Sequence, residues 1–181
     1  MNVKNTEGLI KHARDLSNLT VSSIKGAMLL LNSMNYDKIK ITTICEKAGV
    51  SRMAFYNNFK SIDDLITSLI CDLNDEMTEK IGSPFRKTTT VLWYENVLKI
   101  IQGHEDLLKA LLGADLFEKY LVLINSFALH RQNEFTEEEK FMRLAWAGAF
   151  INIVRNWVEN DFSTPISELA LYMSKTLIVK I

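Results

Sequence analysis

The side chains best suited to binding chemistry lie in one stretch, ITTICEKAGVSRMAFYNNFKSIDDL, which covers residues 41–65. Arg52, Tyr56 and Asn57 offer a guanidinium, a phenol and a carboxamide at helical spacing, and Lys60 follows just beyond them. These groups are the donors and acceptors that contact phosphates and base edges in the major groove of DNA. The free N–H groups at the start of such a helix also favour a phosphate. The pattern therefore indicates DNA binding.

Two short helices and a tight turn must hold these side chains outward. Ala48 lies near the end of the first helix, where a small residue lets the two helices approach closely, and Gly49 suits the left-handed backbone that ends it. Ser51 is placed to cap the second helix, which runs to about Phe59. A pair of helices joined in this way is a helix-turn-helix. The apolar residues predicted to hold it together are Ile44, Ala48, Val50 and Phe55.

This stretch resembles the helix-turn-helix of the TetR family in the order and spacing of its residues. The resemblance is carried by Ala48-Gly49-Val50-Ser51, by Phe55-Tyr56 and Phe59, and by Asp63-Asp64-Leu65, and it covers roughly residues 19–70. Beyond residue 70 only the number and length of the helices are similar. The family consists of homodimeric bacterial regulators, mostly repressors, that release DNA when a small molecule enters the C-terminal core.

The resemblance implies roles for individual residues. Ser51 would cap the recognition helix, Arg52 and Met53 would face bases, Tyr56 would contact backbone or base, and Asn57 would lie at the groove edge. Phe55 and Phe59 would belong to the core. The full set of candidate DNA-contacting residues is Lys40, Thr42, Thr43, Ser51, Arg52, Met53, Tyr56, Asn57 and Lys60.

Two positions depart from the family pattern. Lys40 stands where the family usually has a capping threonine, so the cap of the first helix either shifts to Thr42 or is lost, although a lysine can still reach a phosphate. Ile62 stands where the family favours a lysine that touches the DNA backbone, and Lys60 is the candidate substitute. These departures keep an alternative open, in which the chain has the TetR fold but has lost DNA binding and acts as an interaction or ligand-sensing protein.

Charge is distributed unevenly along the chain. Residues 1–60 hold nine basic and four acidic residues, a net charge of +5, whereas the remainder carries a net charge of −6. A basic end on an acidic body fits a protein of which one end meets a polyanion. The sequence has no apolar run long enough to span a membrane and begins without the apolar segment of a signal peptide, so we expect a cytoplasmic protein. Both cysteines, Cys45 and Cys71, are expected to be buried free thiols.

The chain is predicted to be all-α, because it has two prolines and seven glycines and its apolar residues recur at helical rather than strand spacing. The Gly82-Ser83-Pro84 break divides it into a DNA-binding domain, residues 1–60, a connecting fourth helix at about 62–81, and a ligand-binding and dimerisation domain, residues 82–181. The predicted helices cover residues 19–34, 44–48, 51–59, 61–81, 89–102, 104–112, 115–131, 136–160 and 165–179. Thr136 with Glu139 predicts a capping box, and Pro165 is expected at the first helical position.

The two last helices predict a homodimer. The helix at 136–160 is apolar on more than one face, so one side can meet its own core and the other a second subunit, and the last helix carries a similar stripe. Aromatic residues of this half are candidates for lining an effector pocket, although aromatic residues at this spacing also form ordinary cores. The candidates are Trp93, Phe117, Phe127, Trp146 and Phe150.

The sequence carries no catalytic or cofactor motif. It lacks a G-x-S-x-G elbow, a phosphate-binding loop, an H-E-x-x-H pair and a C-x-x-C pair, and its histidines have no metal-ligand spacing. We therefore expect a protein that is not an enzyme and needs no cofactor or metal. Its expected partners are an operator in double-stranded DNA, a small-molecule effector of unknown identity and a second copy of the chain.

Overall fold

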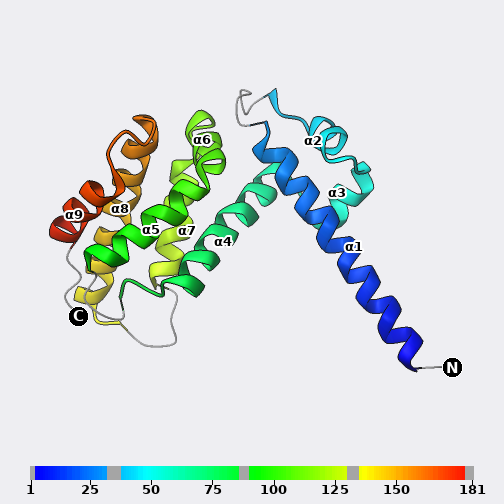
Figure 1. The fold of residues 1–181 in the computed structure, drawn as a ribbon, viewed down its shortest axis with the longest axis horizontal. Coiled ribbons are helices and arrows are strands. Elements are labelled where there is room, and N and C mark those ends of the chain that lie inside the picture. Colours follow the sequence, from blue (N-terminus) through cyan, green and yellow to red (C-terminus); the bar gives the residue numbers. More distant parts are fainter. Residues whose placement is uncertain (1–2, 32–37, 86–89, 130–134, 178–181) are drawn as a thin grey trace. The chain divides into compact units, whose positions relative to one another are not determined.

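The computed structural model describes residues 3–31, 38–85, 90–129 and 135–177, with only the backbone described for residues 3–10 and 13. Within those ranges the chain forms helices and no strand, which confirms the predicted all-α class (Figure 1). The helices are α1 (Val3–Leu29), α2 (Ile41–Ala48), α3 (Arg52–Asn58), α4 (Ile62–Lys80), α5 (Val91–Gly103), α6 (Glu105–Gly113), α7 (Phe117–Leu129), α8 (Glu137–Glu159) and α9 (Ile166–Thr176). They divide into two compact units, Met1–Ile66 and Thr67–Ile181.

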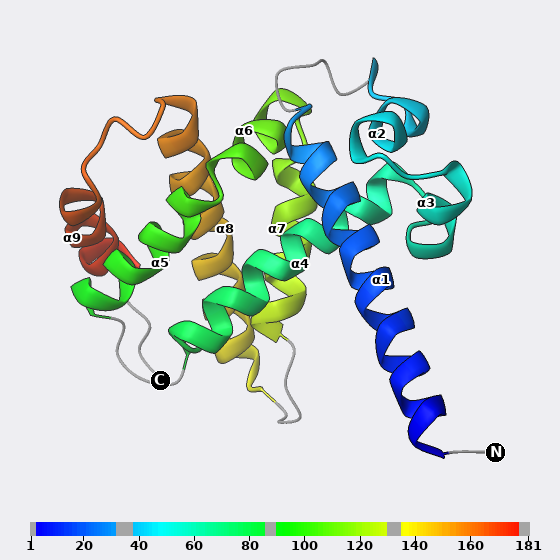
Figure 2. The same ribbon diagram turned by 45° about the vertical axis from the view of Figure 1, so that its right-hand side comes forward.

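The first unit packs α2 and α3 against the later part of α1, while the first turns of α1 extend beyond them (Figure 2). The prediction that this helix begins at residue 19 was wrong, because α1 begins at Val3. Its early residues lack the buried stripe on which the prediction relied: Leu16 and Leu19 are exposed, whereas Ile24 is fully buried. The core of the unit is formed by Ile24, Met28, Ile44, Phe55, Phe59 and Leu65.

Helix α4 begins in the first unit and ends in the second. Its start is held by two hydrogen bonds: the Asp64 N–H donates to Ser61 Oγ at 3.1 Å, and the Lys60 N–H donates to Asp64 Oδ2 at 2.9 Å. The first bond satisfies one of the N–H groups that a helix start leaves without intrahelical partners, and the second ties the preceding residue to the helix. The division of the chain into domains 1–60 and 82–181, with 62–81 connecting them, stays a prediction.

The second unit is a helical bundle in which α7 packs on α8, α5 packs on α9, and α6 packs on α8. Thr136 and Glu139 form the predicted capping box at the start of α8. Pro165 differs slightly from expectation, since it is the N-cap of α9 and lies one residue before the helix. Thr90 caps α5 by accepting the Trp93 N–H at 3.2 Å.

A buried chain of hydrogen bonds joins α5, α8 and the end of α9. The Trp146 Nε1–H donates to Tyr94 Oη at 3.1 Å, and the Tyr94 hydroxyl donates to the Leu177 carbonyl at 2.9 Å. Burial also raises the pKa of Tyr120 far above its usual range, so this phenol is neutral at any physiological pH. The two hydrogen bonds hold the side chains of Trp146 and Tyr94 in place inside the bundle.

The two cysteines differ in burial. Cys45 is buried, as predicted, but the prediction for Cys71 was wrong, since its side chain is exposed. Cys71 lies beside the apolar stripe of α4, in which Ile70 and Leu73 are fully buried, and it faces away from that core. No helix among the described residues is long and apolar enough to cross a membrane.

Candidate nucleic-acid interface and ligand cavity

The turn between α2 and α3 has the geometry that the sequence predicts. Gly49 adopts the left-handed conformation with φ 67° and ψ 31°, and its N–H donates to the Glu46 carbonyl at 3.3 Å. The Val50 N–H donates to the Cys45 carbonyl at 3.0 Å. A side chain at position 49 would be strained by this backbone, even though no atom stands in its way. The turn therefore needs glycine for its backbone conformation alone.

Helix α3 is anchored through one face and one end. Ser51 Oγ accepts the Ala54 N–H at 3.0 Å, which confirms the predicted cap. Phe55 and Phe59 are buried, as predicted, and their ring centroids lie 5.8 Å apart. This short helix is held at its cap and along its inner face. Its backbone is therefore fixed, and so are the positions from which its outer side chains project.

The outer face of α3 carries Arg52, Met53, Tyr56 and Asn57, and all four side chains are exposed. Met53 and Tyr56 remain 75% and 49% exposed, although both are large and partly apolar. Within the described part of the chain, none of the four side chains is held by a hydrogen bond or an ion pair. Polar groups and an apolar side chain are thus presented together, the combination that reads base edges and thymine methyl groups.

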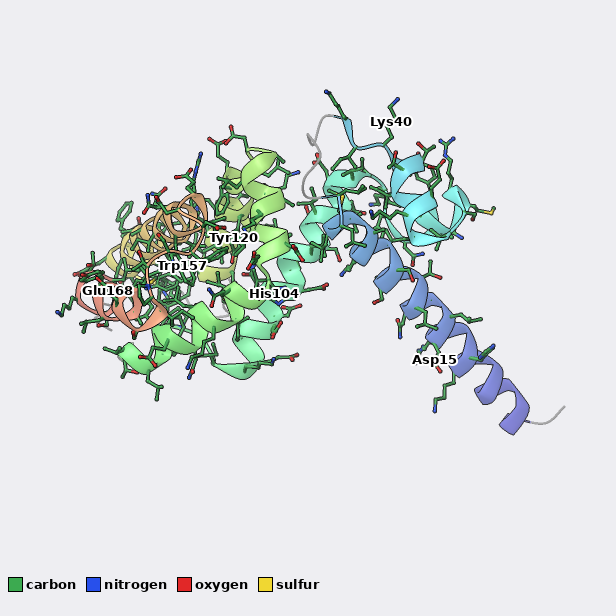
Figure 3. All side chains as sticks on the ribbon, turned by 45° about the horizontal axis from the view of Figure 1, so that its top comes forward. Asp15, Lys40, His104, Tyr120, Trp157 and Glu168 are labelled. Atoms are coloured by element: carbon green, nitrogen blue, oxygen red, sulfur yellow. The ribbon has the colours of Figure 1, made fainter. Side chains whose placement is uncertain are left out.

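The remaining candidates surround this face in sequence. Lys40 is exposed at the N-cap of α2 and points away from the ribbon (Figure 3). Its side chain makes no capping bond, so the cap that the family usually has is lost. Thr42 is exposed and Thr43 is half-buried in the first turn of α2, and Lys60 is exposed between α3 and α4. Their contribution to DNA binding stays a prediction.

The buried Cys45 thiol beneath this surface carries no negative charge. Burial raises the pKa of the Cys45 thiol, the positive charge of Arg52 opposes this effect, and the charge of Glu46 adds to it. Cys45 is therefore a neutral thiol at physiological pH.

A small cavity lies inside the second unit, with a volume of about 30 Å³. Four of the five predicted pocket residues line it: Trp93, Phe127, Trp146 and Phe150. Its remaining lining comes from residues that the prediction missed, on α4, α5, α7 and the segment after α4: Asn74, Met77, Thr78, Gly82, Pro84, Phe85, Val97, Ile124 and Ala128. Ligand pockets for drug-sized molecules measure roughly 300–1,000 Å³, so this cavity as it stands admits only a few atoms.

Phe117, the fifth pocket candidate, does not line this cavity. It is buried at the start of α7, where its ring lies 6.4 Å from the ring of Tyr120 and 6.0 Å from the Arg155 guanidinium, measured between centres. It is a core residue because its position on α7 turns the ring toward Tyr120 and Arg155. Aromatic type alone did not distinguish it from the residues that line the cavity.

Stacked aromatic rings form one wall of the cavity. The rings of Trp146 and Phe150 stack at 4.9 Å, and Phe85 meets Trp146 edge-on at 5.2 Å. Behind Phe85 the buried Arg143 guanidinium lies between two rings, 4.3 Å from Phe85 and 4.1 Å from Phe135. It also donates to the Ala128 carbonyl at 3.2 Å. The positive charge is thus close to the cavity but does not line it.

The later part of α4 is also tied to the corner between α5 and α6. Glu76 accepts a hydrogen bond from Lys80 at 2.7 Å, and its other oxygen lies 2.7 Å from His104 Nε2. The bonds from Lys80 and His104 lower the pKa of Glu76, so this carboxylate stays ionised at neutral pH. Across the described residues, no group of three or more His, Cys, Asp or Glu side chains is placed to hold a metal ion.

The described helices, with a helix-turn-helix ahead of a helical bundle, have the fold of TetR-type transcriptional regulators, which confirms the predicted resemblance at the level of the fold. The sequence itself matches no family model and no curated protein.

Three solved structures are similar to the chain over most of its length. A TetR transcriptional regulator from Streptococcus agalactiae is 18% identical with a TM-score of 0.63, covering 95% of this chain and 99% of that one. The fatty acid degradation regulator FadR from Bacillus halodurans is 18% identical with a TM-score of 0.57, covering 87% and 94%. The dihydroxyacetone kinase operon activator DhaS is 16% identical with a TM-score of 0.56, covering 87% and 93%. At these identities the likeness establishes the fold alone.

Proposed function

We propose that this chain is a sequence-specific DNA-binding transcriptional regulator, a repressor that a small-molecule effector releases from its operator. The observation that carries the proposal is the outer face of α3, where Arg52, Met53, Tyr56 and Asn57 are exposed on a helix anchored by Ser51 and its buried rings. The similarity to solved regulators supports it at the level of the fold.

Direct DNA binding tests the proposal. The purified protein is titrated into labelled DNA from upstream of its own gene, with a shuffled duplex of equal length as the control, and anisotropy is recorded. We expect binding to the upstream DNA to be at least a thousandfold tighter than to the shuffled duplex at physiological salt. Equal, weak binding to both duplexes would instead favour the alternative, a TetR-fold protein that senses a ligand without reading DNA.

Lys60 is expected to contact a phosphate rather than a base, because it is exposed beyond the end of the recognition helix. Lys60→Ala should weaken binding to all sequences alike and lower the slope of log affinity against log salt by about one unit for each contact removed. The control is Lys99→Ala, which removes an exposed lysine from α5. A changed sequence preference in Lys60→Ala, with an unchanged salt slope, would contradict this role.

A homodimer through α8 and α9 is part of the proposal. The outward face of α8 carries Phe141, Ala145, Ala149, Asn152 and Asn156, of which Phe141 is 64% exposed. This face has no charged residue, whereas solvent-facing helix surfaces are usually rich in lysine and glutamate. Leu171 and Tyr172 on α9 are also exposed. A second copy of the same surface would cover these residues.

A charge placed on this face should abolish the dimer. Ala145 is exposed in the described chain, so Ala145→Arg should leave the subunit folded but place two like charges near each other across a two-fold interface. Sedimentation at micromolar concentration should then show a dimer for the parent and a monomer for the variant. Val122→Arg, at a 63% exposed apolar position on α7, is the matched control and should remain dimeric. A dimeric Ala145→Arg protein would rule out this face as the interface.

Helix α4 offers a physical route for effector release. Its first residues, Leu65 and Ile66, belong to the core of the first unit, and its later residues Asn74, Met77 and Thr78 line the cavity. A ligand that enlarges the cavity must displace this helix or its neighbours. The displacement changes DNA affinity only by as much as the ligand prefers one arrangement over the other.

A further inference from the structure

We infer that the cavity of the second unit takes a small, neutral, mainly aromatic molecule that carries one hydroxyl or a similar group able both to donate and to accept a hydrogen bond. The inference rests on the proposed function, since it specifies the effector class of the same regulator. It is carried by two buried polar atoms of residues that line the cavity, Asn74 Oδ1 and Trp93 Nε1. Neither atom has a hydrogen-bond partner within the described residues.

Two other polar groups of the lining residues already have partners. Thr78 Oγ1 donates to the Asn74 carbonyl at 2.8 Å, and the Trp146 Nε1–H donates to Tyr94 Oη at 3.1 Å. Asn74 is only 6% exposed, although it lies in the otherwise apolar stripe of α4. An acceptor and a donor buried without partners are each destabilising, and a ligand that pairs with both removes that penalty.

The two unpaired atoms determine which polar group the ligand needs. Asn74 Oδ1 needs a donor and Trp93 Nε1–H needs an acceptor, and a hydroxyl is one group with both capacities. Among the described residues that line the cavity none is charged, and an ion placed there would lose its hydration without a facing counter-charge. The Arg143 guanidinium stacks on the Phe85 ring but is not part of the lining. A neutral ligand is therefore favoured over an anion.

The other lining residues determine the shape and polarity of the rest of the ligand. Phe85, Trp93, Phe127, Trp146 and Phe150 supply ring faces and edges, which suit a flat aromatic molecule. A benzene ring occupies an apolar cavity of roughly 150 Å³, so the present cavity of about 30 Å³ must enlarge on binding. Met77, an unbranched and adaptable side chain on the wall, lies on α4, so enlargement acts on the helix that leads to the DNA-binding unit.

Three ring molecules of similar size distinguish the possibilities: phenol, toluene and benzoate. Each is titrated into the full-length protein without DNA, and binding is measured by calorimetry and by the shift in melting temperature. We expect phenol to bind about tenfold more tightly than toluene, because only phenol pairs with Asn74 and Trp93. We expect benzoate to bind more weakly than either. Equal binding of phenol and toluene, tighter binding of benzoate, or no binding of any of the three would each overturn the inference.

Two substitutions test the residues themselves. Asn74→Leu removes the acceptor at similar volume, and Trp93→Phe removes the donor while keeping a ring, so each should bring the ratio of phenol to toluene affinity close to one. Trp157→Phe is the matched control, because Trp157 lies outside the cavity wall and its N–H donates to the Thr164 carbonyl. The ratio should stay near ten in that variant, and its loss there, or its persistence in Asn74→Leu and Trp93→Phe, would contradict the assignment. Because no DNA is present, failure of operator binding leaves this result unaffected.

Discussion

Phe59→Ala is expected to lower the free energy of unfolding by about 3–5 kcal/mol, because it empties a core position that is only 5% exposed. The ring packs on Phe55 at the end of α3, and the N–H of residue 59 also closes that helix by donating to the Phe55 carbonyl at 2.8 Å. A loss of this size is a large share of the stability of a small domain. Thermal and urea unfolding followed by circular dichroism measure it.

Tyr56→Ala is the matched control for this effect, since it removes an aromatic ring from the exposed face of α3, the helix that Phe59 closes. Its unfolding free energy should change by less than about 1 kcal/mol, in keeping with a surface substitution. If Phe59→Ala were as stable as Tyr56→Ala, the inward and outward faces of α3 would have been assigned wrongly.

Arg52→Ala is expected to have the opposite profile, with folding intact and base recognition lost. A bidentate arginine contact to guanine discriminates against other bases by about 1–3 kcal/mol, and a dimer would lose that contribution at both half-sites. Affinities for a set of operators with single base changes measure the loss of preference. Lys99→Ala, a charge-removing control far along the chain, should keep the preference of the parent. A uniform fall in affinity, with the preference retained, would make Arg52 a phosphate contact instead.

The helix-turn-helix was predictable from sequence because its requirements are local. Gly49 is needed for a left-handed backbone, Ser51 for a cap, and Phe55 and Phe59 for an inner face, so each residue type follows from a nearby constraint. The start of α1 was not predictable by the same reasoning. Periodicity reveals a helix only where it packs, and the exposed Leu16 and Leu19 break the buried stripe on which the method depends.

The cavity of the second unit was predictable only in part, because it depends on contacts between distant segments. Trp93, Phe127, Trp146 and Phe150 line it, whereas Phe117 is a core residue elsewhere, and binding of an effector there stays a prediction. Asn74 was missed, although an amide inside the apolar stripe of α4 is a signal that could have drawn attention to it. Asn74 and Trp93 come from different helices, and that both line one cavity depends on tertiary packing, which one sequence does not specify.

The most direct test of the proposed function is the operator affinity of a double variant, Arg52→Ala with Tyr56→Ala, measured beside the parent at one salt concentration. Both side chains are exposed on α3, so the melting temperature should match that of the parent. We predict that affinity for the operator falls at least a hundredfold, to the level of binding to a shuffled duplex. A double variant that binds the operator as tightly as the parent would show that this face of α3 does not read DNA.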